Sequence, residues 1–156
     1  MLLTFLRHAE AEVTAPSDHD RQLTSKGRAQ AQKVGEFCKQ RGIVPGMIVT
    51  SPVTRAEQTA GIVAKCFGDV EPMVERWLAC GMDPVTCLDG LRSYAQFEHV
   101  MLVGHEPDFG ETIAACIGLP YPGNLHIRKA SLTTIEMNRL RAGSGRLEYT
   151  IPVRFL

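Results

Sequence analysis

The chain has 156 residues, and its 17 lysines and arginines balance 17 aspartates and glutamates, so the formal net charge is zero. This length is about one domain with its own core, and the scattered basic residues give no support to nucleic-acid binding. The apolar runs fall far short of the ~20 residues of a membrane helix, and the N-terminus lacks the basic segment of a secretion signal. We therefore expect one cytoplasmic domain over residues 1–156, with no nucleic-acid or membrane partner.

The first expected element is an apolar strand over residues 2–6, which ends in Arg7 and His8. A polar loop follows, and it leads to a helix over about 24–41 with Gly42 as its stop. The apolar residues of this helix recur at three- and four-residue steps, which indicates one face packed on a sheet.

A second short strand, over 47–50, leads through Ser51 into a helix over about 53–67. Arg55 falls in the first turn of that helix, where a lone arginine is unfavourable against the helix dipole. A bound anion would reverse this balance. Arg55 is therefore a candidate anion-binding residue.

After a turn at Gly68-Asp69, the sequence predicts a third strand over about 71–74, followed at once by Glu75. Asp83 is a good helix cap with a proline after it, and the helix should run to about Tyr94.

A fourth apolar strand, over 99–104, ends in His105 and precedes a helix over about 108–117. Weak alternation over 131–137 and a hairpin turn then predict two further strands, of which the last, near 147–151, should be antiparallel at the sheet edge. Alternating strands and helices are typical of an α/β fold, here three layers (α/β/α) around a mostly parallel sheet.

In such a sheet the carboxyl ends of the strands share one edge, which is where ligands bind. Arg7, His8, Arg55 and His105 should therefore converge on a pocket for an anion. The chain has neither of the glycine-rich phosphate loops and no short-spaced histidine, cysteine and aspartate cluster for a metal. We expect a site without metal or cofactor, where arginines bind phosphoryl oxygens and one imidazole can act as a nucleophile.

The five cysteines are odd in number and irregularly spaced, which argues against both a disulfide framework and a zinc site. We expect them to be reduced and mostly buried. They are Cys38, Cys66, Cys80, Cys87 and Cys116.

Four blocks of sequence carry a family resemblance: Leu6-Arg7-His8-Ala9, residues 20–27, residues 51–59, and Val103-Gly104-His105-Glu106-Pro107. In this order they resemble the histidine phosphatase (phosphoglycerate-mutase-like) superfamily, and the small SixA-type phosphohistidine phosphatases most. Two positions depart from the usual pattern, since Ala9 stands where glycine is frequent and Gln22 where proline is usual.

The resemblance implies a phosphoglycerate-mutase-like fold and an enzyme without cofactor. It implies that His8 attacks phosphorus and becomes a transient phosphohistidine, while Arg7, Arg55 and His105 bind the phosphoryl oxygens. Arg21 would be a further substrate contact, although from its spacing it could equally be solvated or paired with Asp18 or Asp20.

The group that protonates the leaving group is open at this stage. Glu75 follows the third strand, near where larger superfamily members place an acidic donor, but it could equally be a surface carboxylate paired with Arg76. A departing imidazole needs little help from an acid. The few residues between the third and fourth strands leave no room for a large lid.

Three functions therefore compete. The first is a phosphatase in signal transduction that acts on phosphohistidine in a protein phosphotransfer domain. The second is a phosphatase for small phosphomonoesters, such as sugar or nucleotide phosphates, with Glu75 as its acid. The third is a phosphate-binding module without turnover.

Overall fold

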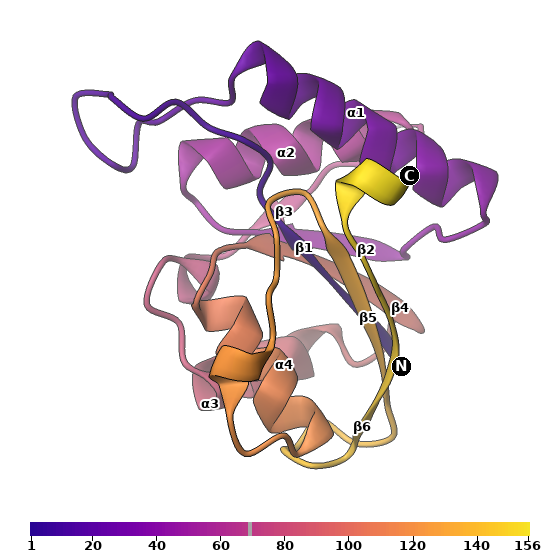
Figure 1. The fold of residues 1–156 in the computed structure, drawn as a ribbon. Helices are drawn as coiled ribbons and strands as arrows, with labels where there is room; N and C mark the ends of the chain where they lie inside the picture. Colours follow the sequence, from indigo (N-terminus) through magenta and orange to yellow (C-terminus); the bar gives the residue numbers. More distant parts are fainter. Residues whose placement is uncertain (69) are drawn as a thin grey trace.

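Six strands form one mixed sheet in the order β3-β2-β4-β1-β5-β6 (Figure 1). The computed structural model describes residues 1–68 and 70–156. The predicted turn at Gly68-Asp69 includes Asp69, which lies outside the described residues. The strands are β1 (Leu2–Arg7), β2 (Met47–Thr50), β3 (Met73–Val74), β4 (His99–Gly104), β5 (Leu132–Met137) and β6 (Gly145–Ile151).

Helices cover both faces of this sheet, with α1 and α2 on one side and α3 and α4 on the other (Figure 1). The predicted three-layer α/β/α fold is therefore confirmed. The helix expected to reach Tyr94 ends its α-helical part earlier and continues as a 3-10 turn, η2 (Arg92–Tyr94). The α-helices are α1 (Ser25–Gln40), α2 (Thr54–Lys65), α3 (Pro84–Leu91) and α4 (Asp108–Ile117).

The helix ends lie where the capping residues predict them. The Thr24 hydroxyl accepts a hydrogen bond from the Gly27 amide at 3.0 Å and so caps α1. Asp83 caps α3 in the same way. Gly118 follows α4 with a positive φ of 72°, the left-handed conformation that glycine adopts most easily.

The central strands divide their side chains between two cores. In β1, Leu3 and Phe5 pack on the α3 and α4 side, whereas Leu6 packs on the α1 and α2 side. In β4, Leu102 and Val103 point to opposite faces in the same way. This alternation follows from the two-residue period of a strand, and it fixes the direction in which each strand delivers its last residues.

The sheet register brings the carboxyl ends of β1, β2 and β4 level with one another. Arg7 pairs with Gly104, and Thr50 pairs with Val103. One residue further on, the His8 amide donates to the Gly104 carbonyl at 2.9 Å. The chain therefore leaves all three strands at one edge, as the prediction required.

The remaining strands differ from expectation in two details. β5 pairs antiparallel with β1 as well as with β6, so the antiparallel part of the sheet is larger than one edge strand. β3 has only the residues Met73–Val74, because its pairing with β2 covers two positions. In the part of the chain that the structure describes, every helix is too short or too polar to cross a membrane.

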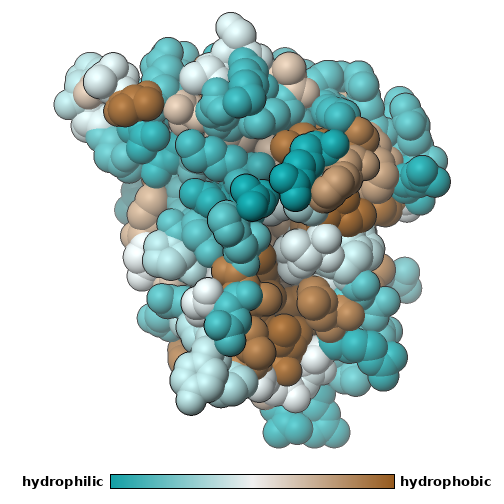
Figure 2. Space-filling model, in the orientation of Figure 1, coloured by the Kyte–Doolittle hydropathy of each residue, from teal (hydrophilic) through white to brown (hydrophobic). Residues whose placement is uncertain are grey.

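The surface seen in Figure 2 is mainly hydrophilic in its upper half, where α1 lies in Figure 1. Three of the five cysteines are buried, Cys66 is half-buried, and all five are free. Cys80 is exposed, and the expectation that the cysteines are mostly buried is confirmed by the other positions.

Candidate active site

Three of the predicted site residues meet at the carboxyl edge of the sheet. His8 follows β1, Arg55 lies in the first turn of α2, and His105 follows β4, and each is at most 6% exposed. The Arg55 Nε donates to the His8 Nε2 at 3.3 Å, and the two imidazole centroids lie 5.3 Å apart. The pocket therefore contains two imidazoles next to a buried guanidinium.

The hydrogen bonds of His8 determine which of its nitrogens can react. Its Nδ1 lies 2.8 Å from the Ala9 carbonyl oxygen, which can only accept, so Nδ1 carries the proton. The Nε2 is then unprotonated, and its lone pair accepts the hydrogen bond from the Arg55 Nε. Burial, together with the positive charge of Arg55 and Arg7, lowers the pKa of His8 to about 3. His8 is therefore a neutral imidazole at neutral pH, as a nucleophile must be.

The second imidazole, His105, is held by the hydroxyl of Ser51. The His105 Nε2 lies 2.8 Å from the Ser51 Oγ, and the His105 Nδ1 is buried with no hydrogen-bond partner among the described residues. Burial, followed by the charge of Arg55, lowers the pKa of His105 to about 4. A buried polar atom without a partner is unusual, and a phosphoryl oxygen could supply that partner.

Ser51 itself was not predicted as a site residue, although it is fully buried. The signal in the sequence is its position directly after β2, which matches the positions of His8 and His105 after their strands.

Arg7 lies near the same histidines and is hydrogen-bonded to the loop that precedes β5. Its Nη1 donates to the Ile127 carbonyl at 2.8 Å, while its Nε is buried without a partner among the described residues. The charge of Arg7 is close enough to lower the pKa of both His8 and His105. Arg7 therefore keeps a donor that an anion can use.

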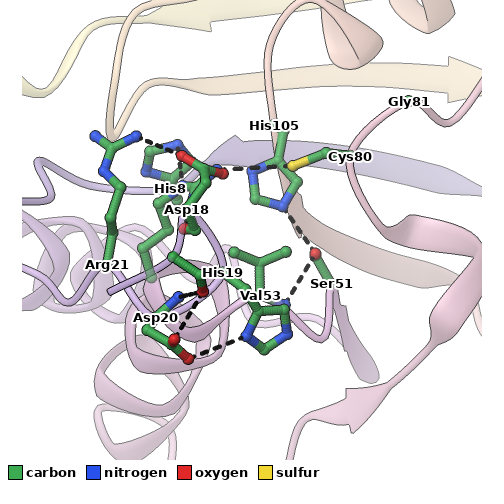
Figure 3. Close-up of polar contacts among 12 residues, drawn as sticks. His8, Asp18, His19, Asp20, Arg21, Ser51, Val53, Cys80, Gly81 and His105 are labelled. Carbon is green, nitrogen blue, oxygen red and sulfur yellow. Dashed lines mark hydrogen bonds and ion pairs between the residues drawn. The ribbon is translucent and has the colours of Figure 1, made fainter. Parts of the chain in front are cut away.

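Asp18, expected only as a possible partner of Arg21, connects Arg21 with Arg55, and Figure 3 shows its contact with Arg21. Its Oδ1 accepts from the Arg21 Nη1 at 2.8 Å, and its Oδ2 accepts from the Arg55 Nη2 at 3.0 Å. The backbone oxygen of Asp18 accepts from the Arg55 Nη1 at 2.7 Å. Arg21 thus reaches the site through this carboxylate, and the guanidinium groups already hold an anionic group of the chain itself.

The nearby His19 and Asp20 stay on the exposed loop (Figure 3).

Glu75 lies next to Tyr94, and its role as the leaving-group acid stays a prediction. Its Oε1 accepts a hydrogen bond from the Tyr94 hydroxyl at 2.5 Å, and no ion pair joins it to Arg76 among the described residues. This bond raises the pKa of Tyr94, together with burial of the phenol. Glu75 acts here as an acceptor, and in the described part of the chain no hydrogen bond links it to His8 or His105.

Glu106 is a second carboxyl group that the sequence analysis did not single out. It follows His105 directly, is half-buried, and accepts a hydrogen bond from the Gly110 amide at 3.1 Å. Burial raises the pKa of Glu106, although the charge of Arg7 acts in the opposite direction. A carboxyl group that keeps its proton to higher pH is suited to be an acid.

The loop between β3 and α3 supplies the outer wall of the site. Asp108 is 6% exposed, and its Oδ2 accepts from the amides of Gly81 at 2.8 Å and Met82 at 3.2 Å. The Cys80 thiol lies 3.7 Å from the Arg55 Nη2 (Figure 3). Burial of its sulfur raises the pKa of Cys80, so it remains mostly a thiol.

The described residues contain no group of three or more histidine, cysteine, aspartate or glutamate side chains that could hold a metal ion. The groups that meet at the site are imidazoles and a guanidinium. A neutral imidazole with an unprotonated Nε2, next to arginine donors, can accept a phosphoryl group.

Comparison with known proteins agrees with this geometry. A profile of the histidine phosphatase superfamily (branch 1) matches residues 3–79. The phosphohistidine phosphatase SixA homolog of Haemophilus influenzae is 31% identical over 134 residues, which cover 78% of this chain and 80% of that protein.

Solved structures extend the similarity of the fold over nearly the whole chain. The protein histidine phosphatase SixA complexed with tungstate superposes with a TM-score of 0.90 at 21% identity, covering 99% of both chains. The α-ribazole phosphatase from Shigella flexneri has a TM-score of 0.81 at 16% identity, covering 98% of this chain and 97% of that one. The similarity in sequence over four fifths of a SixA homolog and the shared fold show that this chain belongs to the histidine phosphatase superfamily.

Proposed function

We propose that this protein is a phosphatase that removes phosphate from phosphohistidine on another protein, through a phosphohistidine intermediate on His8. The observation that carries the proposal is the pair of contacts of His8, whose Nδ1 lies against the Ala9 carbonyl while its unprotonated Nε2 faces Arg55 and accepts a hydrogen bond from it. The SixA homolog of Haemophilus influenzae, which is named as a phosphohistidine phosphatase, supports the substrate class.

The reaction has two transfers. In the first, the His8 Nε2 forms a bond to phosphorus while the bond from phosphorus to the substrate nitrogen breaks, and the substrate histidine leaves as a neutral imidazole. In the second, a water oxygen attacks phosphorus, the bond to Nε2 breaks, and inorganic phosphate leaves with His8 restored. Arg7, Arg55 and His105 offset the charge on the phosphoryl oxygens in both steps.

The leaving group favours phosphohistidine over an alcohol ester. An imidazole whose other ring nitrogen carries a proton leaves with a conjugate-acid pKa near ~6.5, so it depends little on an acid. Glu75 accepts a hydrogen bond from Tyr94, and among the described residues it has no hydrogen bond to His8 or His105. The short segment 75–83 between β3 and α3 supports an accessible pocket, since a small metabolite is usually enclosed by a lid.

A second candidate is a phosphatase for small phosphomonoesters, with Glu106 in place of Glu75 as the acid. The observation that favours it is the raised pKa of Glu106 directly beside His105. A structural neighbour named as an α-ribazole phosphatase has a related fold.

The two candidates are separated by a time course of phosphate release. The substrates are a phosphorylated histidine phosphotransfer domain, free phosphohistidine and p-nitrophenyl phosphate, and the enzymes are wild type and His8→Ala. We expect His8-dependent release that is fastest from the phosphorylated domain. A preference for the ester would assign the second function, and phosphate binding without any turnover would leave a binding module.

Two carboxyl variants, Glu106→Gln and Glu75→Gln, identify the acid in the same assay. We expect either change to alter release from phosphohistidine by less than about threefold, because the leaving imidazole needs little protonation. A loss of about 100-fold or more on the ester alone in Glu106→Gln would show that Glu106 protonates an alkoxide.

A further inference from the structure

A cavity of about 470 Å³ adjoins the active site on the Arg7 side, and its lining is strongly basic. We call it the basic pocket. Its charged and ionisable lining residues are Arg7, Lys26, His126, Arg128, Lys129 and Arg154. No aspartate or glutamate is among the described residues that line it.

Three distant parts of the chain build this pocket. Lys26 comes from the first turn of α1, and Arg154 from the C-terminal 3-10 turn, η4 (Val153–Phe155), which lies beside α1 in Figure 1. Arg128 and Lys129 come from the loop that precedes β5. Figure 2 shows strongly hydrophilic residues on this face, between α1 and the chain end.

The basic pocket is held in place relative to His8 by Arg7. The Arg7 side chain donates to the Ile127 carbonyl at 2.8 Å, and the Ala130 amide donates to the Arg7 carbonyl at 3.0 Å. The loop with Arg128 and Lys129 is thus fixed from both sides to the end of β1. Arg7 thus belongs both to the site of His8 and to the lining of the basic pocket.

The positive charges of the pocket are only partly compensated within the protein, by Glu10, whose pKa is lowered by the hydrogen bond and charge of Lys26 and by the charge of Lys129. Lys26 pairs with Glu10 at 2.8 Å, but in the described part of the chain Arg128, Lys129 and Arg154 take part in no ion pair. The Arg154 guanidinium lies 4.7 Å from the centre of the Phe155 ring, a contact that holds it in place without neutralising it. The whole chain has zero net charge, so this face is positive by arrangement rather than by composition.

We propose that the basic pocket binds acidic side chains that flank the phosphohistidine of a partner protein. This inference rests on the proposed function, and it names the surface of the partner that the enzyme recognises. Arg128, Arg154 and His126 are exposed, whereas a small ligand is usually enclosed by most of its surface. Exposed charges of one sign mainly speed the encounter with an oppositely charged partner.

The test compares two triple variants. The pocket variant is Arg128→Gln/Lys129→Gln/Arg154→Gln, and the control is Lys33→Gln/Lys39→Gln/Arg92→Gln, which removes the same charge from exposed positions outside the pocket. Both are assayed at 20 and 500 mM NaCl on a phosphorylated histidine phosphotransfer domain with acidic residues around its histidine, and on free phosphohistidine.

We expect the pocket variant to lower kcat/KM for the domain by about tenfold at 20 mM NaCl, and the difference to shrink to about twofold at 500 mM because salt screens rim charges. Activity on free phosphohistidine should change by less than about twofold in both variants, because these side chains do not touch the reacting group. An equal loss on both substrates, or the same loss in the control variant, would overturn the proposal.

A binding measurement keeps this inference separate from the proposed function. Fluorescence anisotropy with a labelled hexaglutamate peptide at 20 mM NaCl needs no turnover. Weaker binding in the pocket variant, by about fivefold, but not in the control would support the basic pocket even if the wild type hydrolysed no phosphohistidine. Equal binding by both variants, or tighter binding of an oligonucleotide of matched charge, would overturn it.

Discussion

Replacing Asp18 by asparagine should tighten the binding of a free oxyanion. In the structure the Asp18 carboxylate bridges Arg21 and Arg55, at 2.8 and 3.0 Å, and so engages donors that an incoming phosphoryl group needs. Binding of a substrate must break at least the contact with Arg55. Asparagine is of nearly the same size and removes the negative charge, while the backbone bond from Arg55 to residue 18 remains.

The magnitude follows from the exposure of this carboxylate. The Asp18 side chain is 65% exposed, so each of its ion pairs falls in the range of ~0–1 kcal/mol that is typical of surface pairs. The pair with buried Arg55 should lie at the upper end of that range. A total near 1 kcal/mol corresponds to about a fivefold change in an equilibrium constant. We therefore expect Kd for tungstate or inorganic phosphate to fall by about three- to tenfold.

Isothermal titration calorimetry with tungstate measures this Kd directly and requires no catalysis. Asp20→Asn is the matched control, because Asp20 lies on the same loop but bonds to Ser17 and His19 rather than to an arginine of the site. Its Kd should remain that of the wild type. If Asp18→Asn bound tungstate no better, or more weakly, the reasoning would be refuted, and Asp18 would instead serve to orient Arg21 and Arg55 for the substrate.

Three further changes test other parts of the structure. Ser51→Ala removes the hydroxyl that is hydrogen-bonded to His105. Because a hydrogen bond contributes about 1 kcal/mol, we expect kcat/KM to fall by about three- to tenfold with little change in Tm. An unchanged kcat/KM would contradict a role for this hydroxyl in positioning His105. Urea unfolding should show a free energy of unfolding that falls as the pH decreases from 7.5 to 4.5, because the pKa values of His8 and His105 are about 3 and about 4 in the folded protein but about 6.5 in the unfolded chain. The unfolded chain therefore binds more protons in this window, and the slope is up to about 1.4 kcal/mol per pH unit for each histidine. A flat profile would be inconsistent with the burial of the two histidines. Gly27→Ala places a Cβ against the Glu10 carbonyl oxygen, so we expect the free energy of unfolding to fall by about 1–3 kcal/mol and Tm to fall by several degrees in a calorimetric scan. The control Gly61→Ala, in α2, places its Cβ in open space and should raise Tm slightly in the same scan.

Those parts of the site that depend on local pattern were predictable from the sequence. An apolar strand that ends in a polar residue places that residue at the sheet edge, which is why His8 and His105 could be assigned to one pocket before their 5.3 Å separation was known. Arg55 could be assigned because a helix start disfavours an unpaired cation. The caps of α1 and α3 follow from side chains only two or three residues from their partners.

The contacts that could not be predicted join residues far apart in the chain. Asp18 and Arg55 are separated by 37 positions, and Glu75 and Tyr94 by 19, with no spacing rule that connects them. Glu75 binds Tyr94 rather than the adjacent Arg76 because the packing of α3 and η2 brings the Tyr94 hydroxyl to it, and this packing cannot be deduced from the local sequence. The exposure of Cys80 likewise depends on the wall that Asp108 stabilises.

The basic pocket shows why charge composition alone misjudges such a protein. Along the sequence the lysines and arginines are dispersed and balanced, so no local window indicates a positive face. The pairing of β1 with β5 brings the loop before β5 to the end of β1, and the chain end then packs beside the start of α1. Cations from three segments thereby meet next to Arg7 without changing the net charge. Since the field of a protein acts over a Debye length of about 10 Å rather than over the whole molecule, a neutral chain can still select an acidic partner.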